Sequence, residues 1–181
     1  IGPSGSGKST FLRLINKLIS PTKGYISLNG EDISKLDSIC YRRRVSMLSQ
    51  SPVTYVGTVR DNLLMGRVFQ EKEMLSDNQL SAALKSVKLD VDLGEDILNL
   101  SGGEAQRVAI ARLMLCDCDV YLLDEPSSAL DDLTEDFVIN TMVDMAKEKN
   151  KTIIYVTHSK SMADKYSDRV IKIVDGRISN E

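Results

Sequence analysis

The chain has 181 residues and a net charge of −3; 42% of its residues are hydrophobic and 27% are charged. A chain of this length forms one domain, with room for a subdomain, so a large multidomain machine is excluded. The apolar fraction supports a folded core, and the acidic balance gives no overall positive field to attract nucleic acid or anionic lipid. Any phosphate-binding site must therefore be local.

The sequence carries no signal for a membrane span or for disulfides. Its longest uninterrupted apolar runs have four residues, far fewer than the roughly 20 that cross a bilayer. Cys40, Cys116 and Cys118 form an odd number in a chain that is large enough to fold without disulfides. Because there is only one histidine, Cys116 and Cys118 fit buried thiols better than a soft-metal site. Reduced thiols of this kind are typical of the cytosol.

The first half of the chain alternates helical and strand patterns. Apolar residues recur at helical spacing over 9–19, which predicts a helix there. A short strand is predicted at 25–28, ended by the turn pair Asn29-Gly30, and a second strand at 45–49. The basic cluster 42–44 is interpreted as a solvated entrance to that second strand.

The second half predicts a sheet interleaved with helices. Residues 58–98 show helical spacing and no convincing strand, which indicates a helical subdomain. After this subdomain the sequence predicts, in chain order, a helix at 103–115, a strand at 120–123, a helix at 133–149, a strand at 152–157 and a hairpin with Asp175-Gly176 at its turn. Continuous apolar strands separated by helices are typical of a parallel sheet covered on both faces, so the predicted class is α/β.

The first nine residues contain a phosphate-binding pattern. Gly2-Pro-Ser-Gly-Ser-Gly-Lys-Ser9 has the glycines that let backbone N–H groups close around phosphate oxygens at the start of a helix. Lys8 would reach the β and γ phosphates, and the Ser9 hydroxyl would bind Mg²⁺. The alternative, a flexible Gly/Ser-rich terminus, is disfavoured because an amphipathic helix follows at once. The predicted nucleotide-binding residues of this loop are Gly2, Pro3, Ser4, Gly5, Ser6, Gly7, Lys8, Ser9 and Thr10.

Two adjacent acids end the predicted strand at 120–123. Asp124 and Glu125 would lie at the carboxyl edge of the sheet, where α/β proteins bind ligands. Asp124 would hold Mg²⁺, and Glu125 would polarise a water for attack on the γ-phosphate. The same pattern alone is commonly a strand entering a solvated turn, so the prediction depends on the phosphate loop.

The stretch Leu100-Ser-Gly-Gly-Glu104 forms a second anion-binding helix start. It also fits an ordinary helix cap, with Ser101 as the capping residue and Glu104 as its capping-box partner. Both interpretations can hold together.

These motifs together resemble the nucleotide-binding domain of ATP-binding cassette (ABC) proteins. Gly2–Ser9 matches Walker A, Gln50 the Q-loop, 100–104 the signature, and 120–124 Walker B; Ser128-Ala-Leu-Asp131 and His158 match the D-loop and the switch histidine. The resemblance implies a RecA-like P-loop NTPase core with an inserted ABC helical subdomain. The expected division is a first part of the core at 1–57, the helical subdomain at 58–115, and a second part of the core at 116–181.

The resemblance also implies roles and partners. Two copies would form a head-to-tail homodimer in which each ATP lies between Walker A of one subunit and Ser101, Gly102 and Gly103 of the other. Glu125, His158 and Gln50 would be catalytic, Asp131 would contact the nucleotide, and Ser9, Gln50 and Asp124 would hold Mg²⁺. Hydrolysis of ATP to ADP and phosphate would release the dimer.

Within the family, the sequence favours a free-standing ATPase subunit of a transporter. Such a subunit lies on the cytoplasmic face of the cell membrane, with 51–68 as the surface that docks an integral membrane permease. A narrower likeness to a small bacterial group of iron exporters, related to plant aluminium-tolerance ATPases, suggests a metal ion as solute. The solute, the direction of transport and the permease are not fixed by the sequence.

Other classes of P-loop protein fit the sequence less well. A DNA-repair or chromosome-maintenance head would carry a long coiled coil between the Q-loop and the signature, whereas Gln50 and Ser101 are 51 positions apart and no heptad run separates them. The absence of such an insertion also disfavours a nucleic-acid partner. A GTPase or a small-molecule kinase is disfavoured because the Asn-Lys-x-Asp motif that recognises guanine is absent: the stretch 16–19 begins Asn-Lys but has no aspartate.

The resemblance further implies strands before Walker A, and we expect these strands to be missing from this chain. A complete domain has a few dozen residues there, with the strand that leads into the loop and an aromatic residue that stacks on adenine. The chain starts at Ile1-Gly2-Pro3, so we expect it to be a fragment that by itself binds ATP poorly.

Overall fold

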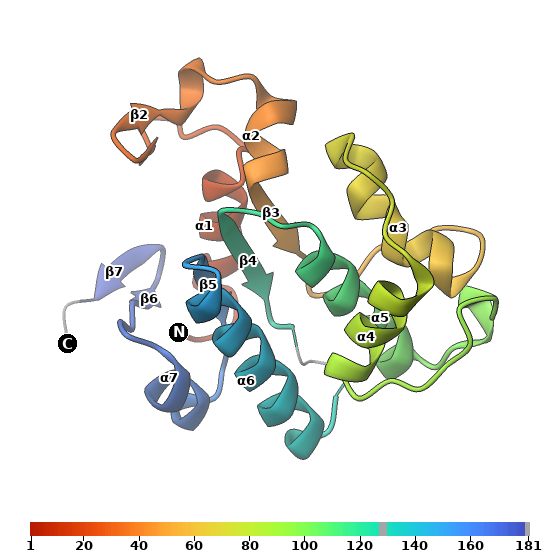
Figure 1. The fold of residues 1–181 in the computed structure, drawn as a ribbon. Helices are drawn as coiled ribbons and strands as arrows, with labels where there is room; N and C mark the ends of the chain where they lie inside the picture. Colours follow the sequence, from red (N-terminus) through yellow and green to blue (C-terminus); the bar gives the residue numbers. More distant parts are fainter. Residues whose placement is uncertain (127–129, 180–181) are drawn as a thin grey trace.

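The structure, a computed structural model, describes residues 1–126 and 130–179, apart from the side chain of residue 132. At its centre is a three-stranded parallel sheet of β3 (Val45–Leu48), β4 (Val120–Asp124) and β5 (Thr152–Val156), with β4 in the middle (Figure 1). All five residues of β4 are buried. The predicted α/β class with a parallel sheet is confirmed.

The register of the sheet brings the ends of its strands together. Leu48 pairs with Leu123, and Asp124 pairs with Val156. Parallel strands end at one edge, so the segments that carry Gln50, Glu125 and His158 all leave the sheet there.

Helices cover both faces of the sheet. On one face, Leu122 of β4 packs in a cluster with Leu12 of α1 (Lys8–Ile15) and Tyr41 of α2 (Ser38–Arg44). On the opposite face, where the side chains of Tyr121 and Leu123 point because strand residues alternate, the cluster contains residues of α5 (Gly102–Leu115) and α6 (Asp132–Glu148). The core therefore has two apolar layers around β4.

Three helices form the layer beside the sheet. Leu63 of α3 (Val59–Gln70) and Leu80 of α4 (Asp77–Ser86) are buried in the same cluster as Ile110 of α5. Figure 1 shows α3, α4 and α5 grouped on one side of the sheet. Two of these helices, α3 and α4, lie within residues 58–98, and α5 follows after a short 3₁₀ turn at Ile97–Asn99. An isolated bridge joins Thr58 and Asp96.

Two small hairpins complete the described chain. β1 (Ser27–Leu28) and β2 (Glu31–Asp32) pair antiparallel, as do β6 (Lys172–Val174) and β7 (Arg177–Ser179). Their turn residues all have positive φ: 52° and 84° at Asn29-Gly30, and 49° and 73° at Asp175-Gly176. Both predicted turn pairs are confirmed, because this turn type needs two left-handed residues.

The structure differs from the sequence-based expectations in four places. Residues 42–44, predicted to enter a strand, form the last turn of α2, because the side chain of Asp37 caps this helix by accepting from the N–H groups of Ile39 and Cys40. The first helix ends at Ile15 rather than at residue 19, since Lys17 has φ 58°. A short helix, α7 (Lys160–Tyr166), was not predicted, because its seven residues are too few for a periodic pattern; Ser159 caps it. A short 3₁₀ helix also spans Ile33–Lys35.

Among the described residues, no helix has the length and apolar character required to cross a lipid bilayer.

Candidate functional site

The phosphate loop is shaped by glycines that no other residue could replace without strain. Gly2, Gly5 and Gly7 have φ values of 152°, 75° and 98°. A Cβ on Gly2 would lie 2.0 Å from the backbone oxygen of Ile173, so the loop passes too close to β6 for a side chain. Ile1 fixes this approach, since its backbone oxygen accepts a 2.9 Å hydrogen bond from the N–H of Ile173.

The loop ends at the N-terminus of α1 and encloses a lysine. Gly7 is the N-cap residue of α1, so the first N–H groups of the helix and its dipole face the loop. Lys8 is only 6% exposed, and its ammonium donates 2.9 Å hydrogen bonds to the backbone oxygens of Gly2 and Pro3. The hydroxyl oxygen of Ser6 is buried with no partner among the described residues. A cradle of this kind, with a buried cation and a free hydroxyl, fits a phosphate group.

Ser9 and Asp124 meet across the site. The Ser9 hydroxyl donates a 2.8 Å hydrogen bond to Oδ1 of Asp124, whose side chain is 3% exposed at the end of β4. A hydroxyl and a carboxylate are the hard oxygen donors that Mg²⁺ prefers, so this pair fits a magnesium ion.

Glu125 is held by two side chains from other segments. Its Oε2 accepts a 2.8 Å hydrogen bond from Nε2 of Gln50, and its Oε1 lies 2.7 Å from Nε2 of His158. Glu125 has φ 49°, a left-handed conformation that a residue with a side chain adopts only when its surroundings hold it. The structure thus brings together the three residues that the sequence predicts as catalytic.

The signature residues form the N-terminus of α5. Ser101 is the N-cap residue, and Glu104 accepts from both the N–H and the hydroxyl of Ser101 in a capping box. The hydroxyl and the N–H of Ser101 lower the pKa of the Glu104 carboxyl. Gly102 is exposed, and a Cβ placed on it would contact nothing. In the described part of the chain, no hydrogen bond or ion pair connects Ser101, Gly102 or Gly103 with the phosphate loop.

Asp131 caps a helix in this structure. Its carboxylate accepts a 3.0 Å hydrogen bond from the N–H of Thr134 at the start of α6, and contacts with the hydroxyl and the N–H of Thr134 lower its pKa. Ser128 and Ala129, the first residues of the predicted D-loop, lie outside the described residues.

Gln106 is a buried polar residue next to the site that is not among the predicted site residues. This glutamine is fully buried in α5, and its Nε2 donates a 2.7 Å hydrogen bond to the backbone oxygen of Pro126, the residue after Glu125. The available signal was a polar side chain one helical turn before Ile110, on a face of α5 that is otherwise apolar.

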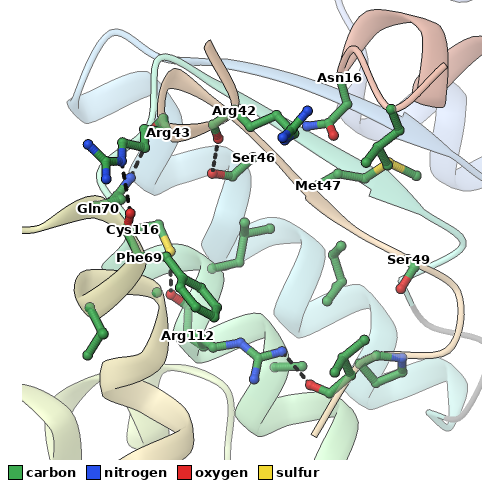
Figure 2. Close-up of a pocket in the computed structure, with 18 of the residues that line it drawn as sticks. Asn16, Arg42, Arg43, Ser46, Met47, Ser49, Phe69, Gln70, Arg112 and Cys116 are labelled. Carbon is green, nitrogen blue, oxygen red and sulfur yellow. Dashed lines mark hydrogen bonds between the residues drawn. The ribbon is translucent and has the colours of Figure 1, made fainter. Parts of the chain in front are cut away.

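A groove of about 810 Å³ opens between α2, β3, α3 and α5 (Figure 2). Its wall includes Val53, Val68 and Phe69, whose apolar side chains are exposed. Arg112 donates a 2.7 Å hydrogen bond to the backbone oxygen of Val53 and lies over the ring of Tyr55, and its burial lowers the pKa of its guanidinium. The surface of the groove is therefore mainly apolar, and the arginine side chains that line it add positive charge.

One of the two neighbouring buried cysteines, Cys116, lines this groove. Cys116 and Cys118 are buried, and contact with Cys118 together with burial raises the pKa of the Cys116 thiol. Within residues 1–126 and 130–179, no group of three or more potential ligands from His, Cys, Asp and Glu forms a metal site.

Comparison with known proteins identifies the family. A family model described as ABC transporter matches residues 1–128. The chain belongs to the ABC transporter family. The relative "ABC transporter I family member 17" of Arabidopsis thaliana is 44% identical over 179 residues, which cover 98% of this chain and 68% of the relative. "Protein STAR1" of Oryza sativa subsp. japonica is 41% identical over 179 residues, which cover 98% of this chain and 51% of the relative.

A solved structure gives the same result for the fold. The ATP-binding cassette MJ0796, described as a dimer in a post-hydrolysis state bound to ADP and Pi, matches with a TM-score of 0.88 and 29% identity over 99% of this chain and 81% of that one. The ATP-binding cassette fold predicted from the motifs is therefore confirmed. This chain is an ATP-binding cassette, and it spans 68% and 51% of the two plant relatives.

Proposed function

We propose that this chain is the subunit that binds and hydrolyses ATP in an ABC transporter and so powers the passage of a solute through a separate membrane subunit. The observation that carries the proposal is the placement of Glu125, whose carboxylate is fixed by Gln50 and His158 beside the Ser9–Asp124 pair. Phosphoryl transfer needs a base, a phosphate cradle and a metal-binding pair in one place, and these residues would supply all three.

In the proposed reaction, the loop from Gly2 to Thr10 binds the phosphates of ATP. Lys8 turns its ammonium from the carbonyls of its own loop to the β and γ phosphates. Ser9 and Asp124, with Gln50, would hold Mg²⁺, which supplies charge neutralisation of the phosphates when bound. These residues orient the γ-phosphate toward Glu125.

Glu125 acts as the general base. It takes a proton from a water as the water oxygen bonds to the γ-phosphorus and the bond from that phosphorus to the β–γ bridging oxygen breaks, which leaves ADP and phosphate. Gln50 and His158 keep the carboxylate aimed at this water. In this proposal His158, whose side chain is half exposed, also contacts the γ-phosphate.

The active form is a head-to-tail homodimer. Ser101, Gly102 and Gly103 make a helix start suited to phosphate, yet in the part of the chain that the structure describes they make no hydrogen bond to the phosphate loop of their own subunit. Each ATP would be closed between Walker A of one subunit and this signature of the other, and Asp131 would leave its cap to contact the nucleotide. The dimeric state of the related cassette supports this arrangement.

The membrane subunit docks in the groove beside α3 and α5. Five residues of the predicted surface 51–68 line it, namely Pro52, Val53, Tyr55, Gly66 and Val68. Exposed apolar side chains gathered in one groove mark an interaction surface. Docking there would hold the subunit at the cytoplasmic face of the membrane and link Gln50 to the permease.

The proposed solute class is a metal ion. In this proposal residues 58–115 act as the helical subdomain, flanked by the core segments 1–57 and 116–181.

The test compares Glu125→Gln with the unaltered full-length protein. Glu125→Gln should keep ATP binding, lower turnover by about 10²-fold or more, and accumulate as a dimer with ATP and Mg²⁺ in light scattering. Glu148→Gln, which removes the same charge from the far end of α6, is the control and should behave as the unaltered protein. Unchanged turnover in Glu125→Gln would reject the role of Glu125, and a monomer under trapping conditions would reject the dimer.

A further inference from the structure

Gln106 is a buried polar residue that the proposed reaction leaves without a role. It lies in α5, five residues after Ser101, and its side chain is 1% exposed. A buried amide is costly unless it is hydrogen-bonded, and the Nε2 of Gln106 has its partner in the backbone oxygen of Pro126 at 2.7 Å. This bond fixes where α5 lies relative to the segment that follows β4.

The partner of Gln106 is the residue next to the catalytic carboxylate. On the sheet side, the N–H of Glu125 donates a 3.2 Å hydrogen bond to the backbone oxygen of Val156, and Glu125 has φ 49°. Pro126 has no N–H to donate, so its carbonyl is the polar backbone group through which this residue can be anchored. The backbone around the catalytic carboxylate is therefore held twice: by β5 at the N–H of Glu125 and by α5 at the carbonyl of Pro126.

We propose that Gln106 is a positioning residue that ties the start of α5 to the carboxylate of Glu125 through the carbonyl of Pro126. The inference rests on the proposed function, in which Ser101 meets the nucleotide bound by the partner subunit. Because Ser101 and Gln106 belong to one helix, a shift of Ser101 moves Gln106 and, through Pro126, the backbone at Glu125. The bond thereby couples the nucleotide in one site of the dimer to the base in the other.

The experiment measures Mg²⁺-ATP hydrolysis and equilibrium ATP binding by the full-length protein. Gln106→Met keeps the side-chain length and removes the donor. We expect kcat to fall at least about tenfold, since turnover is sensitive to small misplacements of catalytic groups, while ATP bound per chain stays unchanged and the Hill coefficient for ATP falls toward 1. Loss of folded protein would instead lower the bound ATP in proportion to turnover.

A second variant covers the case in which Gln106→Met does not fold. Gln106→Leu also removes the donor and is an apolar side chain of similar size that buries no charge, so its kcat should fall as far. Tyr155→Phe is the matched control. It removes a side-chain donor, the Tyr155 hydroxyl that bonds to the backbone oxygen of Met162 at 2.9 Å, from the neighbouring strand, and kcat should not change.

The outcomes separate this inference from the proposed function. Turnover and a Hill coefficient like those of the unaltered protein in both Gln106 variants would overturn the inference, as would a fall in kcat matched by an equal fall in bound ATP. If Glu125→Gln abolishes hydrolysis in the same assay, the proposed function stands in either case. If Glu125→Gln hydrolyses ATP normally, the proposed function itself fails.

Discussion

The hydroxyl of Ser9 donates a 2.8 Å hydrogen bond to Oδ1 of Asp124, a residue 115 positions further along the chain. The two oxygen atoms, which are the proposed Mg²⁺ ligands, come from the first turn of α1 and from the last residue of β4. Because α1 packs on the sheet through Leu12 and Leu122, the apolar core that stabilises the fold also sets the distance between the two oxygens.

Ser9→Ala should weaken the response of the enzyme to magnesium. The variant removes one of the three proposed oxygen ligands, so the Mg²⁺ concentration for half-maximal ATP hydrolysis should rise by about 10- to 100-fold, the range typical of lost metal-site interactions. Ser9→Thr keeps a hydroxyl at this position and is the control. An unshifted Mg²⁺ titration for Ser9→Ala would contradict the assignment.

The sequence predicts this site in outline because its residues follow strands. Asp124, Glu125 and His158 each come at or just after the carboxyl end of a parallel strand, and such ends meet at one edge. Local patterns also suffice for the turns at Asn29-Gly30 and Asp175-Gly176, whose backbone angles depend on those two residues alone.

Tertiary contacts explain what the sequence did not predict. The bond between Gln50 and Glu125 joins positions 75 apart and follows from strand register. The bond from Gln106 to Pro126 depends on where α5 packs against β4. Residues 42–44 belong to a helix that the Asp37 side chain caps, whereas the basic cluster alone predicts the entrance to a strand.

A mixed-dimer experiment tests the sharing of each site between two subunits. Lys8→Ala disables Walker A and Ser101→Arg disables the signature. In a head-to-tail dimer of one such variant with the other, one site has both halves altered and the second has both halves intact. Each mixed dimer should therefore recover up to about half of the normal activity, and a randomly paired equal mixture up to about a quarter, while either variant alone stays inactive.

Its control is a mixture of Lys8→Ala with the double variant Lys8→Ala/Ser101→Arg, in which no site has an intact Walker A. Recovery that does not exceed this control would rule out head-to-tail sharing. ATP hydrolysis and ATP retention by the mixed dimers give two independent measurements.

Alanine at two glycines should have opposite effects on stability. Gly2→Ala would place a Cβ 2.0 Å from the backbone oxygen of Ile173 at φ 152°, so the free energy of unfolding should fall by about 1–3 kcal/mol. Gly102 starts α5, and its Cβ would meet nothing. Gly102→Ala should therefore raise the free energy of unfolding by about 0.5–1 kcal/mol.

Urea unfolding of both variants measures this difference. Gly102→Ala should at the same time weaken the ATP-dependent dimer, since its proposed role is to bring backbone close to the partner's nucleotide. A variant that is both less stable and fully able to dimerise would contradict both parts of the assignment for Gly102.

The capping box at the signature should make stability depend on pH in the acid range. Hydrogen bonds from Ser101 lower the pKa of Glu104 below its ordinary value of 4.5 in the folded protein. The folded state therefore binds fewer protons than the unfolded state between the two pKa values, so the contribution of Glu104 is fully present above about pH 4.5 and is lost as pH falls through the folded-state pKa.

Glu104→Gln removes this titration but keeps an oxygen that can accept from Ser101. Urea unfolding at a series of pH values between neutrality and pH 3 should show a shallower acid decline for Glu104→Gln than for the unaltered protein. Glu73→Gln removes the same charge from the exposed loop between α3 and α4, and it should leave the slope unchanged. An equal change of slope in both variants would mean that net charge, rather than the hydrogen bonds from Ser101, governs the acid response.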